Sequence, residues 1–146
     1  MSIPFLDSNI LLRHLTNDDP QRGQACFALI QAIEHGELSA WTSDLVIAEV
    51  VFVLSNKNTY HLERETIRDL LLPLINLPGL KLPHKRLYGR VFELYTSLPI
   101  DYIDAYHVAW MEWRGTTEVL SYDKHFDRVE GIQRREPLHG LGHVTT

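Results

Sequence analysis

Short apolar runs alternate with longer stretches of helical periodicity along most of the chain. The runs predict β-strands at residues 3–6, 38–41, 80–82, 119–121 and 132–134. Between them, apolar residues return every three or four positions, which predicts helices over about residues 10–15, 20–36, 43–57, 63–77, 84–97 and 101–114. Local signals support these boundaries, because Asp19 and Pro20 form a helix start and Gly115 follows a helix end.

This order of elements predicts an α/β fold. Parallel strands need crossover connections, so alternating strands and helices favour a parallel sheet covered on both faces. The sequence contains no internal repeat or credible linker, and we expect one domain over residues 1–136 followed by a polar tail at 137–146. Ligand sites of open α/β sheets gather at the carboxyl ends of strands, which is where functional residues are expected.

Composition narrows the class of protein. The 146 residues are 45% hydrophobic and 23% charged, as in globular proteins, which excludes disorder as the main state. A single cysteine, Cys26, excludes an internal disulfide and a cysteine-rich zinc site. No apolar stretch approaches the roughly 20 residues of a membrane span, and the chain start lacks a basic signal region. We therefore expect a cytoplasmic protein without a membrane segment.

The formal net charge of −5 excludes a uniformly basic protein that coats nucleic acid. It leaves open a nuclease, whose metal site is itself acidic. The acid-free stretch 70–92 carries the candidate RNA-binding side chains Lys81, Lys85, Arg86 and Arg90, although an ordinary solvated surface explains them slightly better. Three alternative contacts for RNA adjoin the acidic segments, namely Arg13, Lys124 and Arg128.

Acidic residues stand at chemically informative places. Asp7 follows the first predicted strand and Asp123 follows the fourth, although a turn or helix cap would explain either one alone. Glu49 lies in a predicted helix that is apolar on nearly every face. Because glutamate is seldom buried without a partner, a functional role for Glu49 is at least as good an explanation as a position at the helix edge.

Two more acids, Asp101 and Asp104, open the predicted helix after Pro99. Asp101 is placed as the N-cap, and capping alone explains it. Asp104 falls at the third helical position, where the helix N-terminus stabilises negative charge. Its apolar neighbours predict a largely buried helix, so Asp104 is also a candidate metal ligand.

Carboxylates gathered at one site repel one another, and they either take up protons or bind a hard cation. Mg²⁺ (or Mn²⁺) suits a set of oxygen ligands that also keeps waters. Zinc is disfavoured, because the eight histidines show no paired ligand spacing beside an acidic motif. The sequence therefore predicts a magnesium or manganese site.

Four segments together resemble the PIN-domain ribonucleases, and most closely the VapC-like toxins of toxin–antitoxin pairs. The segments are Leu6-Asp7-Ser8-Asn9, Glu49 in its apolar helix, Asp101-Tyr102-Ile103-Asp104-Ala105 and Ser121-Tyr122-Asp123-Lys124-His125-Phe126. The resemblance covers about residues 3 to 136. It implies a three-layer α/β/α sandwich around a central, mainly parallel sheet of about four to five strands.

The resemblance also implies the site. In it, the catalytic and metal-binding acids Asp7, Glu49, Asp104 and Asp123 line one acidic pocket. Other residues match supporting positions or lie beside the acids, namely Ser8, Asn9, Asp101, Ser121 and Asp127. Ser8, Asn9 and Ser121 would orient acids or waters, although capping and turn hydrogen bonds explain the two serines equally well. Asp127 is better explained as a solvated turn residue, and we expect His125 at the surface or behind the ligands.

The function implied is a metal-dependent endoribonuclease that hydrolyses RNA phosphodiester bonds and leaves 5′-phosphate and 3′-hydroxyl ends. The toxin resemblance further implies a cognate antitoxin protein and a homodimer. One alternative is a PIN nuclease of RNA processing or decay without an antitoxin, and another is a non-catalytic module that binds a basic peptide in its acidic pocket. A phosphatase with an aspartate nucleophile is disfavoured, because Asn9 stands where that chemistry usually wants a second aspartate.

Overall fold

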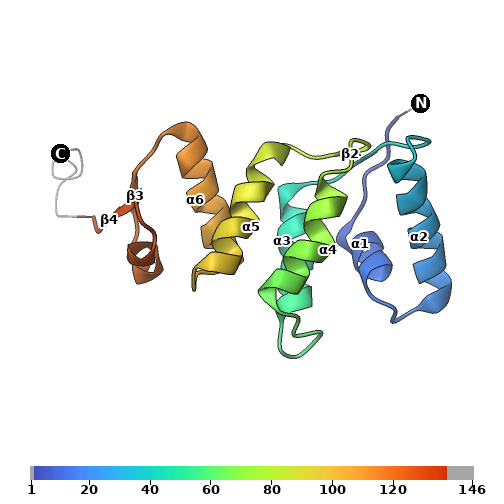
Figure 1. Cartoon of the computed structure of the whole chain (residues 1–146), viewed down its shortest axis with the longest axis horizontal. Coiled ribbons are helices and arrows are strands. Elements are labelled where there is room, and N and C mark those ends of the chain that lie inside the picture. Colours follow the sequence, from blue (N-terminus) through green and yellow to red (C-terminus); the bar gives the residue numbers. More distant parts are fainter. Residues whose placement is uncertain (1, 138–146) are drawn as a thin grey trace. The chain divides into compact units, whose positions relative to one another are not determined.

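The computed structural model describes residues 2–137, and its helices and strands follow the predicted order (Figure 1). The chain divides into two compact units, Met1–Arg86 and Leu87–Thr146. Of the predicted tail, residues 138–146 lie outside the described residues. The extent of the predicted domain over residues 1–136 stays a prediction.

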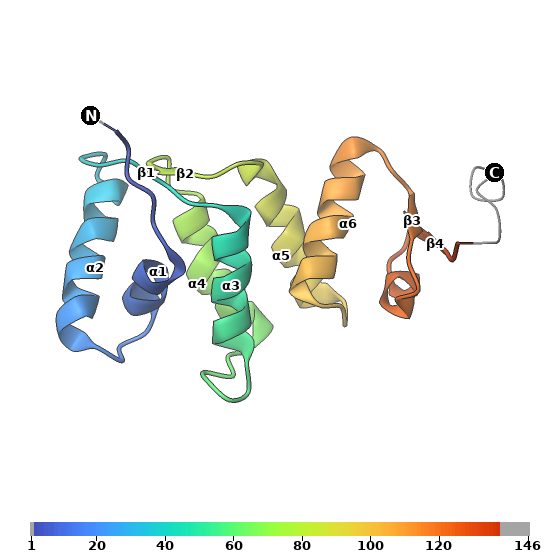
Figure 2. The same ribbon diagram turned by 180° about the vertical axis from the view of Figure 1, so that it is seen from behind.

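The first unit consists of four helices and two short strands. In chain order these elements are α1 (Ser8–Leu15), α2 (Pro20–Glu34), β1 (Ala40–Trp41), α3 (Asp44–Ser55), α4 (Arg64–Ile75) and β2 (Leu80–Lys81). The first three helices begin as the sequence predicts, because side chains of Asp7, Asp19 and Ser43 accept hydrogen bonds from backbone N–H groups of the first turn. Helix α1 lies between α2 and the α3–α4 pair in both views (Figures 1 and 2).

Strand pairing in the first unit is parallel but short. Ala40 of β1 lies opposite Leu80 of β2, and the chain start adds only one isolated bridge, between Phe5 and Trp41. The predicted strand at residues 3–6 is therefore an extended segment rather than a full strand. Pro4 accepts a hydrogen bond from the Trp41 N–H at 2.8 Å, but it has no N–H of its own to extend the ladder.

The crossing of α2 with the segment before β2 depends on a glycine. A methyl carbon added at Gly79 would lie 2.9 Å from both the carbonyl oxygen and Cγ2 of Ile33. The Gly79 carbonyl in turn accepts a hydrogen bond of 2.9 Å from the N–H of Ala40. Ile33 is 1% exposed, so neither side of this contact can move without disturbing the core.

The second unit contains two packed helices and a second parallel pair. Its elements are α5 (Tyr88–Ser97), α6 (Tyr102–Arg114), β3 (Glu118–Leu120), the 3₁₀ turn η2 (Lys124–Arg128) and β4 (Gln133–Arg135). The helix predicted over 84–97 begins only at Tyr88, after the 3₁₀ turn η1 (Lys85–Leu87). Helices α5 and α6 pack through aromatic rings, with the Phe92 and Tyr102 ring centroids 5.7 Å apart.

The structure confirms parallel pairing, with helices α3 and α4 between β1 and β2 in the chain and the 3₁₀ turn η2 between β3 and β4. The ladders form two separate pairs, β1–β2 in one unit and β3–β4 in the other. A single central sheet of four to five strands in an α/β/α sandwich therefore stays a prediction. Across residues 2–137, every helix is too short or too polar to cross a lipid bilayer.

The glycine contact predicts a difference between two Gly→Ala variants. Gly79→Ala should lower the free energy of unfolding by about 1–3 kcal/mol, because the new methyl group overpacks backbone atoms. Gly89→Ala, in α5 with open space around its Cα, should raise it by about 0.5–1 kcal/mol because alanine favours a helix. Urea unfolding followed by circular dichroism measures both, and equal effects would contradict the close approach at Gly79.

Candidate metal centre

The first turn of α6 carries two carboxylates. Asp101 occupies the N-cap position and Asp104 is the third helical residue, as the sequence predicts. Capping does not account for Asp101, however, since its side chain makes no capping hydrogen bond. Its carboxylate is therefore available to a ligand.

Asp104 is the most enclosed of these acids, with a side chain 15% exposed. Burial raises the pKa of the Asp104 carboxyl above its usual value, and the negative charges of Asp123 and Asp101 raise it further. The charges of His107 and His125 act in the opposite direction. Because burial and neighbouring negative charges both oppose ionisation of Asp104, a cation bound here would relieve a cost that the folded chain otherwise carries.

The turn η2 places Asp123 and His125 beside α6. Asp123 is the N-cap of η2, and its Oδ1 accepts a hydrogen bond of 2.9 Å from the His125 N–H. The Ser121 hydroxyl accepts a 2.9 Å hydrogen bond from the Asp123 N–H. Ser121 therefore shapes the turn that presents Asp123, which agrees with the turn explanation of its role.

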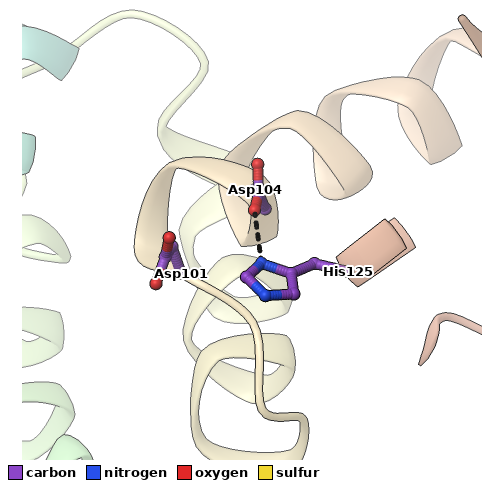
Figure 3. A group of neighbouring side chains, drawn as sticks. All are labelled: Asp101, Asp104 and His125. Carbon is purple, nitrogen blue, oxygen red and sulfur yellow. Dashed lines mark ion pairs between the residues drawn. The ribbon is translucent and has the colours of Figure 1, made fainter. Parts of the chain in front are cut away.

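Three side chains of this unit form a group with metal-ligand chemistry (Figure 3). Asp101, Asp104 and His125 each offer one ligand atom, and these atoms lie within 4.8 Å of one another. His125 Nδ1 lies 3.9 Å from Asp104 Oδ2 and 3.3 Å from Asp123 Oδ1. The sequence did not single out His125 as a member of such a group, and its side chain is 41% exposed. The one sequence signal for its membership is its position two residues after Asp123.

The first unit holds a second group of predicted residues. Asp7 caps α1 by accepting a hydrogen bond from the Ser8 N–H at 2.8 Å. The buried Ser8 hydroxyl donates a 2.8 Å hydrogen bond to Glu49 Oε1. Ser8 thus links the amino end of α1 to the carboxylate of α3. Asn9 is exposed in the first turn of α1.

Glu49 does not lie in a helix that is buried on every face. Leu45 and Phe52 of α3 are 81% and 65% exposed, and Glu49 itself is exposed. Apolar composition gave no information about which face of α3 is covered. A functional role for Glu49 therefore cannot be argued from burial of an unpaired carboxylate. The hydrogen bond from the Ser8 hydroxyl is the contact that positions its carboxylate.

Other acidic and basic candidates have partners of their own. Arg134 contacts Asp127 at 3.0 Å, which neutralises this acid and agrees with its interpretation as a turn residue. Lys85 donates to the carbonyls of Leu77 and Leu80 at 2.5 and 2.7 Å, and burial lowers the pKa of its amine. These contacts leave Asp127 and Lys85 poor candidates for binding a metal ion or RNA, respectively.

Three arginines that the sequence offered as RNA contacts also have partners within the chain. Arg90 forms an ion pair with Glu112 at 2.8 Å, and Arg128 donates a hydrogen bond of 2.5 Å to the Pro99 carbonyl. Arg13 contacts Asp19 at 3.4 Å. These interactions favour the surface explanation of the basic residues over an RNA track.

The structure thus places Asp101, Asp104, Asp123 and His125 together in the second unit, and Asp7, Ser8 and Glu49 together in the first. The implied single pocket of four acids draws on both units and stays a prediction.

Burial of Asp104, together with the neighbouring negative charges, predicts that its ionised carboxylate destabilises the metal-free chain. Below the usual aspartate pKa of 3.8 both folded and unfolded chains carry the proton, so the penalty is absent; it is complete above the raised pKa. Asp104→Asn should therefore raise the melting temperature at neutral pH with chelator, and this gain should shrink as the pH falls toward 3.8. Asp127→Asn, which removes a carboxylate paired with Arg134, is the control and should give no gain. Equal melting temperatures of Asp104→Asn and the natural chain at neutral pH would argue against this penalty.

Comparison of the chain with known protein families finds a match to one family model. The model of the PIN domain matches residues 5–132, which includes both groups of site residues. No curated protein matches the chain. PIN domains have an α/β fold and are typically metal-dependent nucleases. Because the match covers most of its length, the chain belongs to the PIN domain family.

Proposed function

We propose that this protein is a metal-dependent endoribonuclease that hydrolyses RNA phosphodiester bonds. The observation that carries the proposal is the group of ligand atoms from Asp101, Asp104 and His125 within 4.8 Å, with Asp123 beside it. Membership of the PIN domain family supports it, because PIN domains are typically nucleases.

The residues present suit a divalent cation. Asp104 is largely enclosed, its pKa is raised, and two more carboxylates stand nearby, so the group gains free energy when a cation balances its charge. Carboxylate oxygens are preferred ligands of Mg²⁺ and Mn²⁺. Bound here, such an ion supplies activation of water and stabilisation of the charge on the phosphate.

Each acid then has a role. Asp104 and Asp123 would hold the cation, and the family resemblance implies Asp7 as a further metal ligand. Glu49, whose carboxylate accepts a hydrogen bond from the Ser8 hydroxyl, would bind a water of the ion or help to position the attacking water. As water attacks phosphorus, the bond to the 3′-oxygen breaks and that oxygen takes up a proton, which leaves 5′-phosphate and 3′-hydroxyl ends.

RNA cleavage tests this assignment. The natural chain should cut a pool of single-stranded and structured RNA with Mg²⁺ or Mn²⁺ and not with chelator. Asp104→Asn, Asp7→Asn and Glu49→Gln should each lower the rate by about 100-fold or more, since these residues act on the reacting groups. Asp127→Asn, paired with Arg134, should keep nearly full activity. Full metal-dependent cleavage by Asp104→Asn would overturn the assignment.

We propose further that the nuclease is the toxin of a toxin–antitoxin pair, acts in the cytoplasm, forms a homodimer and binds a cognate antitoxin. The support is the resemblance of the four acidic segments to VapC-like toxins. A homodimer or antitoxin contact would cover apolar side chains, and Leu45 and Phe52 of α3 are exposed examples.

Expression in a bacterial host tests the toxin role. The natural chain should stop growth within a few generations, because cleavage of cellular RNA blocks translation. Asp104→Asn, expressed to the same level, should leave growth unchanged, whereas Asp127→Asn should arrest it. A protein that cleaves RNA in solution yet leaves growth unaffected would favour a nuclease of RNA processing.

A further inference from the structure

We propose that His125 is a nitrogen ligand of the bound cation and makes the site favour first-row transition ions, such as Mn²⁺, over Mg²⁺. The inference rests on the proposed metal-dependent function and adds to it a ligand and a metal preference. It treats His125 as part of the site rather than as a surface residue.

The backbone that carries the imidazole is held by a local hydrogen bond. The backbone N–H of His125 donates a hydrogen bond of 2.9 Å to Asp123 Oδ1. The 3₁₀ turn η2 holds Asp123 and His125 at the first turn of α6. Figure 3 shows the ring extending from η2 toward the carboxylates of Asp101 and Asp104. The side chain is thus aimed at the acids before any ion is bound.

The ring nitrogen nearest the acids, Nδ1, makes no hydrogen bond within the described part of the chain. Nδ1 of His125 is buried from solvent and has no hydrogen-bond partner among residues 2–137, although Asp123 Oδ1 is 3.3 Å away. A bare lone pair on Nδ1 facing negative oxygens is repelled by them, so the arrangement calls for a proton or a cation between the atoms. A divalent cation supplies positive charge there and uses the lone pair as a ligand.

The spacing of the ligand atoms suits an ion after small side-chain rotations. An octahedral ion with bonds of about 2.1 Å separates adjacent ligands by about 3.0 Å and opposite ligands by about 4.2 Å. The atoms of Asp101, Asp104 and His125 lie within 4.8 Å of one another, slightly wider than a bound set. The His125 side chain is 41% exposed, so it has room for the rotation that closes this difference.

A nitrogen donor changes which ion is preferred. Mg²⁺ selects oxygen ligands and gives up its waters reluctantly, whereas imidazole suits first-row transition ions. Oxygen ligands alone would hold Mg²⁺ and Mn²⁺ with less discrimination. His125 therefore shifts the preference of the site toward Mn²⁺.

His107 is a matched control for the charge of His125. Both imidazoles lower the pKa of Asp104 through their charge. Of the two histidines, only His125 belongs to the group of ligand atoms. His125→Asn places an amide oxygen near the former Nδ1 and removes the nitrogen donor. His107→Asn makes the same chemical change one turn along α6 from Asp104.

The test titrates Mn²⁺ and Mg²⁺ separately into the full chain and its variants by calorimetry, with folding checked by circular dichroism. The natural chain should bind Mn²⁺ more tightly than Mg²⁺. His125→Asn should weaken Mn²⁺ binding by about tenfold or more and Mg²⁺ binding by much less, while His107→Asn changes neither comparably. Pulsed electron paramagnetic resonance should detect nitrogen coupling to Mn²⁺ in the natural chain and in His107→Asn, and none in His125→Asn.

Equal losses in His125→Asn and His107→Asn would overturn the inference, since charge alone would then explain both. Unchanged Mn²⁺ binding in His125→Asn, with binding lost in Asp104→Asn, would reject His125 as a ligand and leave the proposed function standing. If neither ion binds the natural chain, the proposed function fails as well.

Discussion

Negative charge gathered at the first turn of α6 is the constraint on which the proposed chemistry depends. Asp104 is largely enclosed, and the negative charges of Asp123 and Asp101 add to the cost of ionising it. The helix N-terminus offsets part of this charge. The folded chain nevertheless keeps an arrangement that is fully favourable only with a cation, and such local conflicts are typical of functional sites.

The partners of the other acids make this group stand out. Asp127 has Arg134, and Glu112 has Arg90, so these carboxylates are balanced by arginines on the same unit. A carboxylate with an arginine partner is a poor metal ligand, because the ion must displace the guanidinium group. The arginine partners therefore distinguish Asp127 and Glu112 from the carboxylates of Asp101, Asp104 and Asp123.

Local signals explain what the sequence predicted well. Pro99 and Gly115 bracket α6, so the third helical position of Asp104 followed from short-range rules. The role of His125 depends on η2, a 3₁₀ turn that leaves no hydrophobic period to recognise. The exposure of Glu49 and the extent of the sheet depend on contacts between distant segments, and apolar patterning does not say which face is covered.

The turn from Ser121 to His125 has a consequence for the thermodynamics of ion binding. Two hydrogen bonds within it, from the N–H groups of Asp123 and His125, order its backbone without any ion. The loss of conformational entropy in this segment is thus met during folding rather than at association. An arriving ion needs only to adjust side chains, so more of its interaction energy remains as affinity than at a loop that must first become ordered.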